Sequence, residues 1–284
     1  MIIIKNSGMI LMKKIRKIQI AVLILLIIFS PPVSLLRSMV VLSAYSAYNL
    51  KNSIMEKEGF EIKIPGGLST KETDWYPFVS TFNDNAGIRN FTDNKDLSLT
   101  IMYNFPSYSL LRGCSRIFDP NSRYSSGFYG AYAVQDEDGI YGFNDDGSID
   151  LEAASQIPQF DMQRLVLGAM GLEYNDMVFN WDIVRTENNI NYADSEGWSV
   201  IDSVLTVNSV CHNYKNFSIS YLQYGMPNFE VNNDFTPINM YGRVYAKYFK
   251  EYNCSIFFYI IVPDKNVLEN CDKNILSKSR IYSR

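Results

Sequence analysis

Apolar and polar residues alternate in several short stretches of the chain, and this alternation predicts β-strands. In 59–64 (GFEIKI), Phe60, Ile62 and Ile64 alternate with polar neighbours, and a Pro-Gly-Gly turn follows them. A hairpin is expected over 139–148, because its Asp-Gly pair tolerates the positive φ of a tight turn. Further strands are expected before this hairpin at 75–82, 96–105 and 124–134.

One helix is predicted in the middle of the chain, at 161–171. Asp161 is placed to cap it and Gly171 is placed to end it. Its apolar residues recur at helical spacing: Met162, Leu165, Val166, Ala169 and Met170. We expect this helix to pack on the sheet.

The second half of the chain predicts more strands and a closing hairpin. Pairing the hairpin strands around Tyr252 aligns Val244 and Ala246 with Ile260 and Phe258 on one apolar face, which predicts a core face there. The predicted strands are 177–186, 198–210, 217–224, 241–250 and 254–262, although the spacing of Val200, Ile201, Val204 and Leu205 would also suit a helix in the second of these.

A final helix is predicted at 264–278, with Asp264 as its N-cap and an apolar stripe of Leu268, Cys271 and Ile275. We expect it to cover the other face of the hairpin, which mixes cationic and aromatic residues. Together these elements predict an α+β fold. It consists of a largely antiparallel sheet with one internal and one C-terminal helix packed on it, preceded by an N-terminal hydrophobic helix.

The two ends of this domain resemble PsbP-like extracytoplasmic domains. The resemblance rests on a Gly-Phe-x-Ile-x-x-Pro strand, here Gly59, Phe60, Ile62 and Pro65, and on the closing order of strand, strand and helix. It covers these ends alone, and membership of that family is not inferred from it.

The first fifty residues combine a basic segment with an apolar run. Residues 18–36 carry no charge, and about 19 residues at about 1.5 Å each approach a hydrocarbon core of about 30 Å. Five of the six basic residues precede the run, so the positive-inside rule keeps the N-terminus in the cytoplasm. We therefore expect a single-pass protein that contacts membrane lipid through 18–36. A cleaved signal peptide, which would give a secreted protein, and a buried soluble helix are the alternatives.

This interpretation divides the chain into two parts. Residues 1–50 form a cytoplasmic tail, a signal anchor and a juxtamembrane stretch, and residues 51–284 form an extracytoplasmic domain, with a further division near 140 left open. The whole chain has 26 basic and 30 acidic residues; without the six basic residues of 1–50, the domain has 20 against 30, a net charge of −10. That balance disfavours nucleic acid as a partner, and we expect none, because Lys and Arg provide most of the affinity for it.

Aromatic residues make up 14% of the chain and provide the one candidate binding surface. In the predicted strand 124–134 (YSSGFYGAYAV), Phe128, Tyr129 and Tyr132 could bind a sugar or peptide, although cross-strand packing is the commoner use of such rings. The oligomeric state is open.

Catalytic and metal-binding sets are scarce in the sequence. His212 is the one histidine, and its neighbour Cys211 would point to the opposite face of a strand. Acidic clusters at 136–138 and 144–146 lack the spacing of an EF-hand loop, and nucleotide-binding motifs are missing, so we expect neither metal nor cofactor. The cysteines are far apart, which leaves their disulfide state open: Cys114, Cys211, Cys254 and Cys271.

The sequence therefore favours a non-catalytic, membrane-anchored extracytoplasmic protein that binds an envelope protein or polymer. The alternative is an exported hydrolase that cleaves cell-envelope polysaccharide with two carboxylates. None of the 30 acidic residues is distinguished for that role by its sequence position.

Overall fold

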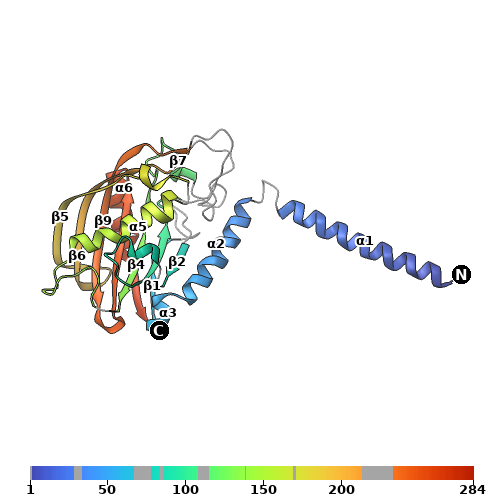
Figure 1. Ribbon diagram of the computed structural model, residues 1–284, viewed down its shortest axis with the longest axis horizontal. Helices are drawn as coiled ribbons and strands as arrows, with labels where there is room; N and C mark the ends of the chain where they lie inside the picture. Colours follow the sequence, from blue (N-terminus) through green and yellow to red (C-terminus); the bar gives the residue numbers. More distant parts are fainter. Residues whose placement is uncertain are drawn as a thin grey trace.

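The computed structural model describes residues 2–28, 34–66, 78–83, 86–107, 115–137, 139–168, 171–212 and 233–284. It is a mixed helix and strand fold built on a large antiparallel sheet, as the sequence predicted (Figure 1). One seven-stranded sheet takes strands from both sides of residue 140. In spatial order they are β2 (Phe78–Phe82), β3 (Leu97–Asn104), β4 (Phe128–Asp136), β10 (Cys254–Val262), β9 (Pro237–Phe249), β6 (Ser195–Asn208) and β5 (Phe179–Tyr192).

Shorter elements lie around this sheet. Two further pairs of strands are β1 (Phe60–Lys63) with β11 (Arg280–Ser283), and β7 (Cys211–His212) with β8 (Asn233–Asp234). The short helices are α3 (Ile54–Glu58), α4 (Ala86–Arg89), η2 (Ser115–Ile117), η5 (Tyr174–Asp176), η6 (Lys250–Tyr252) and η7 (Leu276–Lys278). The predicted strand 217–224 lies outside the described residues.

Both faces of the sheet are buried, so the protein has two hydrophobic cores. Strand β4 contributes to both cores, because alternate side chains of a strand point to opposite faces of the sheet. Phe128 and Tyr132 lie in one core, and Tyr129 lies in the other. The first, the α5 core, lies under α5 (Leu151–Phe160). The second, the α6 core, lies under α6 (Lys265–Asn274) together with α3 and β1.

The internal helix begins ten residues earlier than the sequence predicted. Asp150 caps α5 by accepting hydrogen bonds from the backbone N–H groups of Glu152 and Ala153. The helix passes through Pro158 and continues as a π-helical segment, η3 (Asp161–Leu167). Asp161 is therefore not the predicted cap; it lies within the helical run and is buried in the α5 core.

The closing hairpin forms where it was predicted, but its register differs by one residue. Phe249 pairs with Cys254, and Val244 therefore pairs with Tyr259 rather than Ile260. Asn253 adopts a left-handed conformation with φ 45°, which closes the turn after η6. Because a shift of one residue exchanges the faces of a strand, Ile260 lies in the α6 core and not beside Val244.

Helix α6 confirms the predicted C-terminal helix. Asp264 caps it, and Leu268, Cys271 and Ile275 are buried against the sheet. After η7 the chain adds β11, a strand that the sequence pattern did not predict, and it pairs with β1 from the start of the domain.

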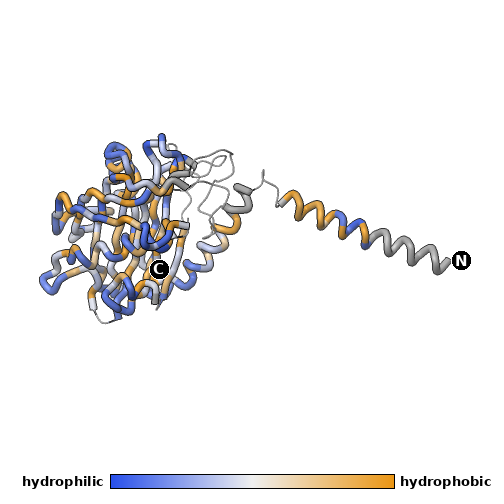
Figure 2. The backbone as a smooth tube through the Cα atoms, turned by 45° about the horizontal axis from the view of Figure 1, so that its top comes forward, coloured by the Kyte–Doolittle hydropathy of each residue, from blue (hydrophilic) through white to orange (hydrophobic). Residues whose placement is uncertain are grey.

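Two helices precede the domain: α1 (Ile2–Ile28) and α2 (Ser34–Lys51). Every described side chain of α1, from Lys14 to Ile27, is exposed, and Figure 2 shows this part of the tube turning from hydrophilic to hydrophobic. Helix α2 runs along the sheet beside β2 (Figure 1). Within the described residues, no helix has both the length and the apolarity needed to cross a membrane.

Candidate functional site

The two edge strands of the sheet, β2 and β5, have different surroundings. At one edge, β2 is covered by α2: the Ser46 hydroxyl accepts a hydrogen bond from Val79 N–H at 3.1 Å, and the Asn49 side chain accepts one from Thr81 N–H at 3.1 Å. The Thr81 hydroxyl in turn donates to Asn49 C=O at 3.0 Å. These polar side chains take the place of a neighbouring strand, so this edge is closed.

At the other edge, β5 has a strand on one side alone within the described part of the chain. Most of its side chains are exposed, including the apolar Ile183 and Val184, and the exposed fraction of Val184 is 68%. Pairing with β6 is regular from Phe179 to Ile183 and then shifts, so the second half of β5 is irregular. No described strand pairs with the outer side of this regular stretch, so a segment of another chain could add to it as a strand.

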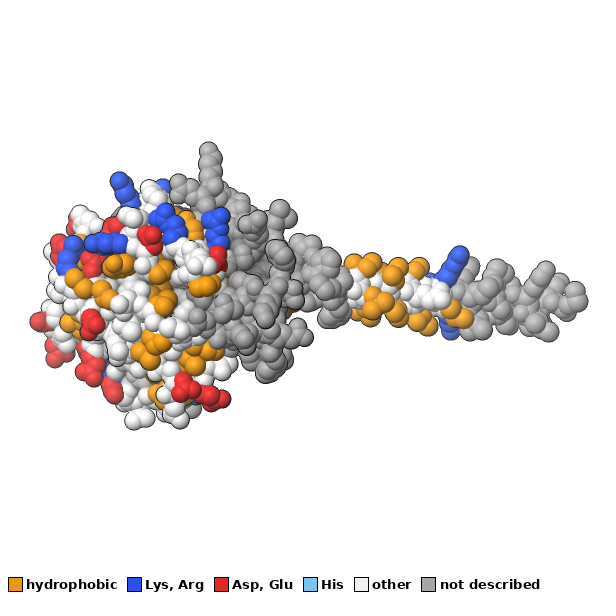
Figure 3. Space-filling model, turned by 90° about the horizontal axis from the view of Figure 1, so that it is seen from above, with side chains coloured by type: hydrophobic (Ala, Val, Ile, Leu, Met, Phe, Trp, Pro, Cys, Tyr) orange, Lys and Arg blue, Asp and Glu red, His pale blue; other side chains and the backbone are white. Residues whose placement is uncertain are grey.

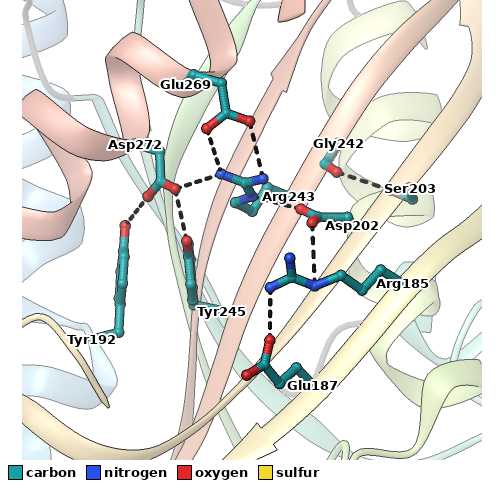
Figure 4. A network of polar contacts seen from close by, with 10 residues as sticks. All are labelled: Arg185, Glu187, Tyr192, Asp202, Ser203, Gly242, Arg243, Tyr245, Glu269 and Asp272. Atoms are coloured by element: carbon teal, nitrogen blue, oxygen red, sulfur yellow. Dashed lines mark hydrogen bonds and ion pairs between the residues drawn. The ribbon is translucent and has the colours of Figure 1, made fainter. Parts of the chain in front are cut away.

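A row of charged side chains runs from β5 across β6 to β9 (Figure 4). Arg185 on β5 pairs in register with Asp202 on β6, and Asp202 pairs in register with Arg243 on β9. The Arg243 guanidinium lies 2.5 Å from a carboxylate oxygen of Asp202, and its side chain is 14% exposed. Because the charges alternate in sign, each carboxylate and guanidinium in the row has an opposite neighbour.

Helix α6 completes this network from above (Figure 4). The Arg243 guanidinium donates to both oxygens of Glu269 at 3.2 Å and to Asp272 at 2.7 Å. The hydroxyls of Tyr192 and Tyr245 also donate to Asp272, each at 2.7 Å, and their rings stack with centroids 3.5 Å apart. Burial, followed by the Asp272 charge, raises the pKa of both tyrosines, so they stay protonated donors.

The network fixes the end of the β5–β6 hairpin, where a groove of about 420 Å³ opens. Asp194 in this groove forms an ion pair at 2.7 Å with Arg280 of β11. The lining residues are Asn191, Tyr192, Ala193, Asp194, Ser195, Glu196 and Ser277. The groove is polar and partly acidic, which suits a cationic or hydroxyl-rich group.

A second polar cluster lies in the α5 core. Asp161 is 4% exposed, and its two carboxylate oxygens accept hydrogen bonds from the hydroxyls of Tyr103 and Tyr132. Burial raises the pKa of Asp161 to about 7, against the two hydrogen bonds, which lower it. The Tyr132 ring stacks on Tyr259 with centroids 4.3 Å apart. The carboxyl has the pKa of a general acid, but it is enclosed by side chains that already use both of its oxygens.

The aromatic residues chosen from the sequence do not form an exposed surface. Phe128, Tyr129 and Tyr132 are buried, with exposed fractions of 3%, 0% and 1%, and they lie on both faces of β4. Both sides of the sheet are covered, so the commoner explanation applies and these rings pack in the cores. The sequence could not indicate this, because alternation alone does not tell a covered face from an open one.

The other sequence candidates contribute little to a site. Residues 211–212 form β7, and the side chains of Cys211 and His212, together with all of Cys114, lie outside the described ones. Cys254 and Cys271 are free and buried. Asp146 closes a turn by accepting hydrogen bonds from Ser148, and the described residues contain no cluster of metal-binding side chains.

The residues of the β5 edge were missed as a site, although 177–186 was predicted as a strand. The charged and polar residues of this strand indicated that it is exposed. Placing the strand at an edge also requires the order of strands in the sheet, which the sequence does not give. No family model matches this chain, and comparisons with curated proteins and with solved structures find no relative. The resemblance to PsbP-like domains therefore gains no support.

Proposed function

We propose that this chain is a membrane-anchored extracytoplasmic binding protein without catalytic activity, and that β5 binds an extended segment of a partner protein. The observation that supports this function is the contrast between the two sheet edges. The chain uses a whole helix to close β2, whereas β5 has a neighbouring strand on one side alone among the described residues, and the apolar side chains of Ile183 and Val184 are exposed. A partner segment would pair with the regular stretch of β5 as an added strand.

The charge of the hairpin indicates which partner segment is suitable. Residues 179–208 contain five acidic residues and one basic residue, a net charge of −4, within a domain whose net charge is −10. Asp182 and Glu187 lie on β5 itself, and Glu187 is exposed beside Arg185 at 2.8 Å. A basic or neutral segment is therefore favoured, and an acidic one is repelled.

The anchoring part of the proposal rests on the N-terminal apolar run. The described side chains of α1 are all exposed, and from Ile18 to Ile27 only Gln19 is polar. The face of this stretch seen in Figure 3 is largely hydrophobic. A helix that is apolar all round requires an apolar surrounding, which a bilayer would provide. The basic residues before it favour a cytoplasmic N-terminus and a domain on the other side.

The proposal can be tested with the full chain in lipid nanodiscs and defined peptides. The probe is a fluorescein-labelled peptide, Lys-Thr-Val-Lys-Val-Thr-Lys, and its binding is followed by fluorescence anisotropy. An added strand pairs through alternate backbone N–H groups. We therefore expect N-methylation of one alternate set of residues to abolish binding and N-methylation of the other set to preserve it. A peptide with Glu in place of Lys should bind several-fold more weakly.

A matched pair of charge reversals locates the site. Asp182→Lys on the regular stretch of β5 should weaken binding of the Lys peptide several-fold, whereas Glu152→Lys, an exposed glutamate on α5, should leave it unchanged. Absence of saturable binding, equal effects of the two N-methylated sets, or equal effects of the two variants would each contradict binding at this edge.

The alternative, a carboxylate-dependent hydrolase, receives less support. Burial raises the pKa of Asp161 to about 7, in the range of a general acid, but this carboxyl is enclosed in the α5 core. Two carboxylates of the charged network, Asp202 and Asp272, are both engaged by Arg243. A hydrolase needs an acid and a second carboxylate on either side of a substrate cleft. Release of reducing sugar from envelope polysaccharide by the full chain would favour this alternative.

A further inference from the structure

Helix α2 has its polar face toward the protein and its apolar face outward. Leu42, Ser46 and Asn49 are buried, and they follow one another at helical spacing along the face that closes β2. The opposite face is exposed and carries Val40, Val41, Ala44, Ala47, Tyr48 and, at its end, Lys51. The exposed fractions of Val40 and Tyr48 are 68% and 69%. An apolar outward face on a helix docked to a sheet edge calls for an apolar surface to cover it.

Two observations indicate that this surface is a lipid bilayer. First, α2 follows α1 after five residues, so the outward face lies close in the chain to the run proposed to enter the membrane. Second, α2 contains no acidic residue and has Arg37 and Lys51 near its ends, although the domain after residue 50 has a net charge of −10. A face without carboxylates can approach phospholipid headgroups at the lowest electrostatic cost.

We infer that α2 lies at the membrane–water interface on the extracytoplasmic side of the bilayer. Its outward face would lie among the headgroups and the adjoining parts of the acyl chains. This inference rests on the proposed anchoring by α1. Tyr48 is the residue best suited to that depth, because its ring is apolar and its hydroxyl can stay hydrated. The contact would be shallow, as for other helices that lie in the interfacial plane.

The position of α2 also sets the orientation of the sheet. Helix α2 covers β2 at one edge, and β5 is the seventh strand of the same sheet. Six strand spacings of about 4.8 Å place β5 about 29 Å from β2 along the sheet. With α2 at the bilayer, β2 becomes the membrane-proximal edge and β5 the distal one.

The test uses the full chain in phosphatidylcholine vesicles that contain some phosphatidylglycerol. A fluorescent amino acid, dansylalanine, replaces Tyr48 in one sample and Val184 of β5 in the other, which leaves the native cysteines unaltered. Lipids with a nitroxide near the headgroup then quench any label at the interface. We expect the label at position 48 to lose about half of its emission or more, and the label at position 184 to lose none.

Each outcome separates the inference from the proposed function. Flotation with vesicles and no quenching at position 48 would overturn the inference and leave the anchor in place. Failure to float would overturn both. A blue shift at position 48 without lipid quenching would mean that a second copy of the chain or another protein covers the face, and it would also overturn the inference.

A label at position 48 could itself disturb the helix, so a pair of variants with the label at another position provides a control. With dansylalanine at Ala44, Tyr48→Glu should reduce the quenching by at least half, because a carboxylate on the outward face opposes insertion. Tyr174→Glu changes a tyrosine of similar exposure on η5 and should have no effect. Equal effects of the two changes would refute a role for the outward face.

Discussion

Replacement of Asp161 by asparagine should change how the stability of the fold depends on pH. Burial raises the pKa of this carboxyl to about 7 in the folded protein, whereas an exposed aspartate in the unfolded chain has a pKa of about 3.9. The folded state therefore holds a proton that the unfolded state releases between these values. The stability that this proton provides is fully present below about pH 4 and is lost as the pH rises through about 7.

The magnitude follows from the two pKa values. Between pH 5 and pH 8 the linkage relation gives a loss of about 2 to 3 kcal/mol in the free energy of unfolding from Asp161 alone. The amide that replaces the carboxyl stays neutral at both pH values and can still bond to Tyr103 and Tyr132. The stability of Asp161→Asn relative to the native chain should therefore improve by about 2 to 3 kcal/mol from pH 5 to pH 8.

Urea unfolding of the full chain in a non-ionic detergent, followed by tyrosine and tryptophan fluorescence, measures this difference. Asp146→Asn is the matched control: hydrogen bonds from Ser148 lower the pKa of Asp146, so it is ionised in both states over this range and adds no slope. The reasoning would be refuted by a difference between Asp161→Asn and the native chain that is the same at pH 5 and pH 8.

Three further changes test other parts of the fold. Arg243→Met leaves three carboxylates without their shared cation and should cost about 2 to 4 kcal/mol in urea unfolding, whereas Arg185→Met on the exposed strand should cost less than about 1 kcal/mol. Gly130→Ala would drive a Cβ into the Met102 carbonyl oxygen and should cost about 3 kcal/mol or more. Gly139→Ala meets no atom of the described residues within 4 Å and should stay within about 0.5 kcal/mol. Burial raises the pKa of the Cys254 thiol to about 12, so mass-spectrometric mapping should find it unmodified by maleimide at pH 8 until urea unfolds the chain.

The sequence predicted those elements whose burial is read from local alternation. Strand β3 (Leu97–Asn104) lies within the predicted strand 96–105, and the apolar stripe of α6 identified its buried side. Helix α5 was missed because Pro158 suggests a break, although the capping residue Asp150 was a usable start signal.

Features that depend on distant parts of the chain were not predictable. The register of the last hairpin is set by its turn, where Asn253 is left-handed, because both faces of these strands are apolar and the side-chain pattern fits either register. The pairing of β11 with β1 joins the two ends of the domain and leaves no local signal. The position of β5 at an edge is likewise a property of strand order and not of its own residues.

The order of strands also limits which partners can reach the proposed site. If α2 rests on the bilayer, the β5 edge lies about 29 Å from β2, on the side of the sheet away from the lipid. A peptide segment that begins at the membrane surface would need about nine extended residues to cover this distance before pairing could start. Partners that are soluble, or that belong to a facing surface, have no such requirement. The same sheet that separates the two edges therefore favours a partner that approaches from outside the membrane over a neighbour within it.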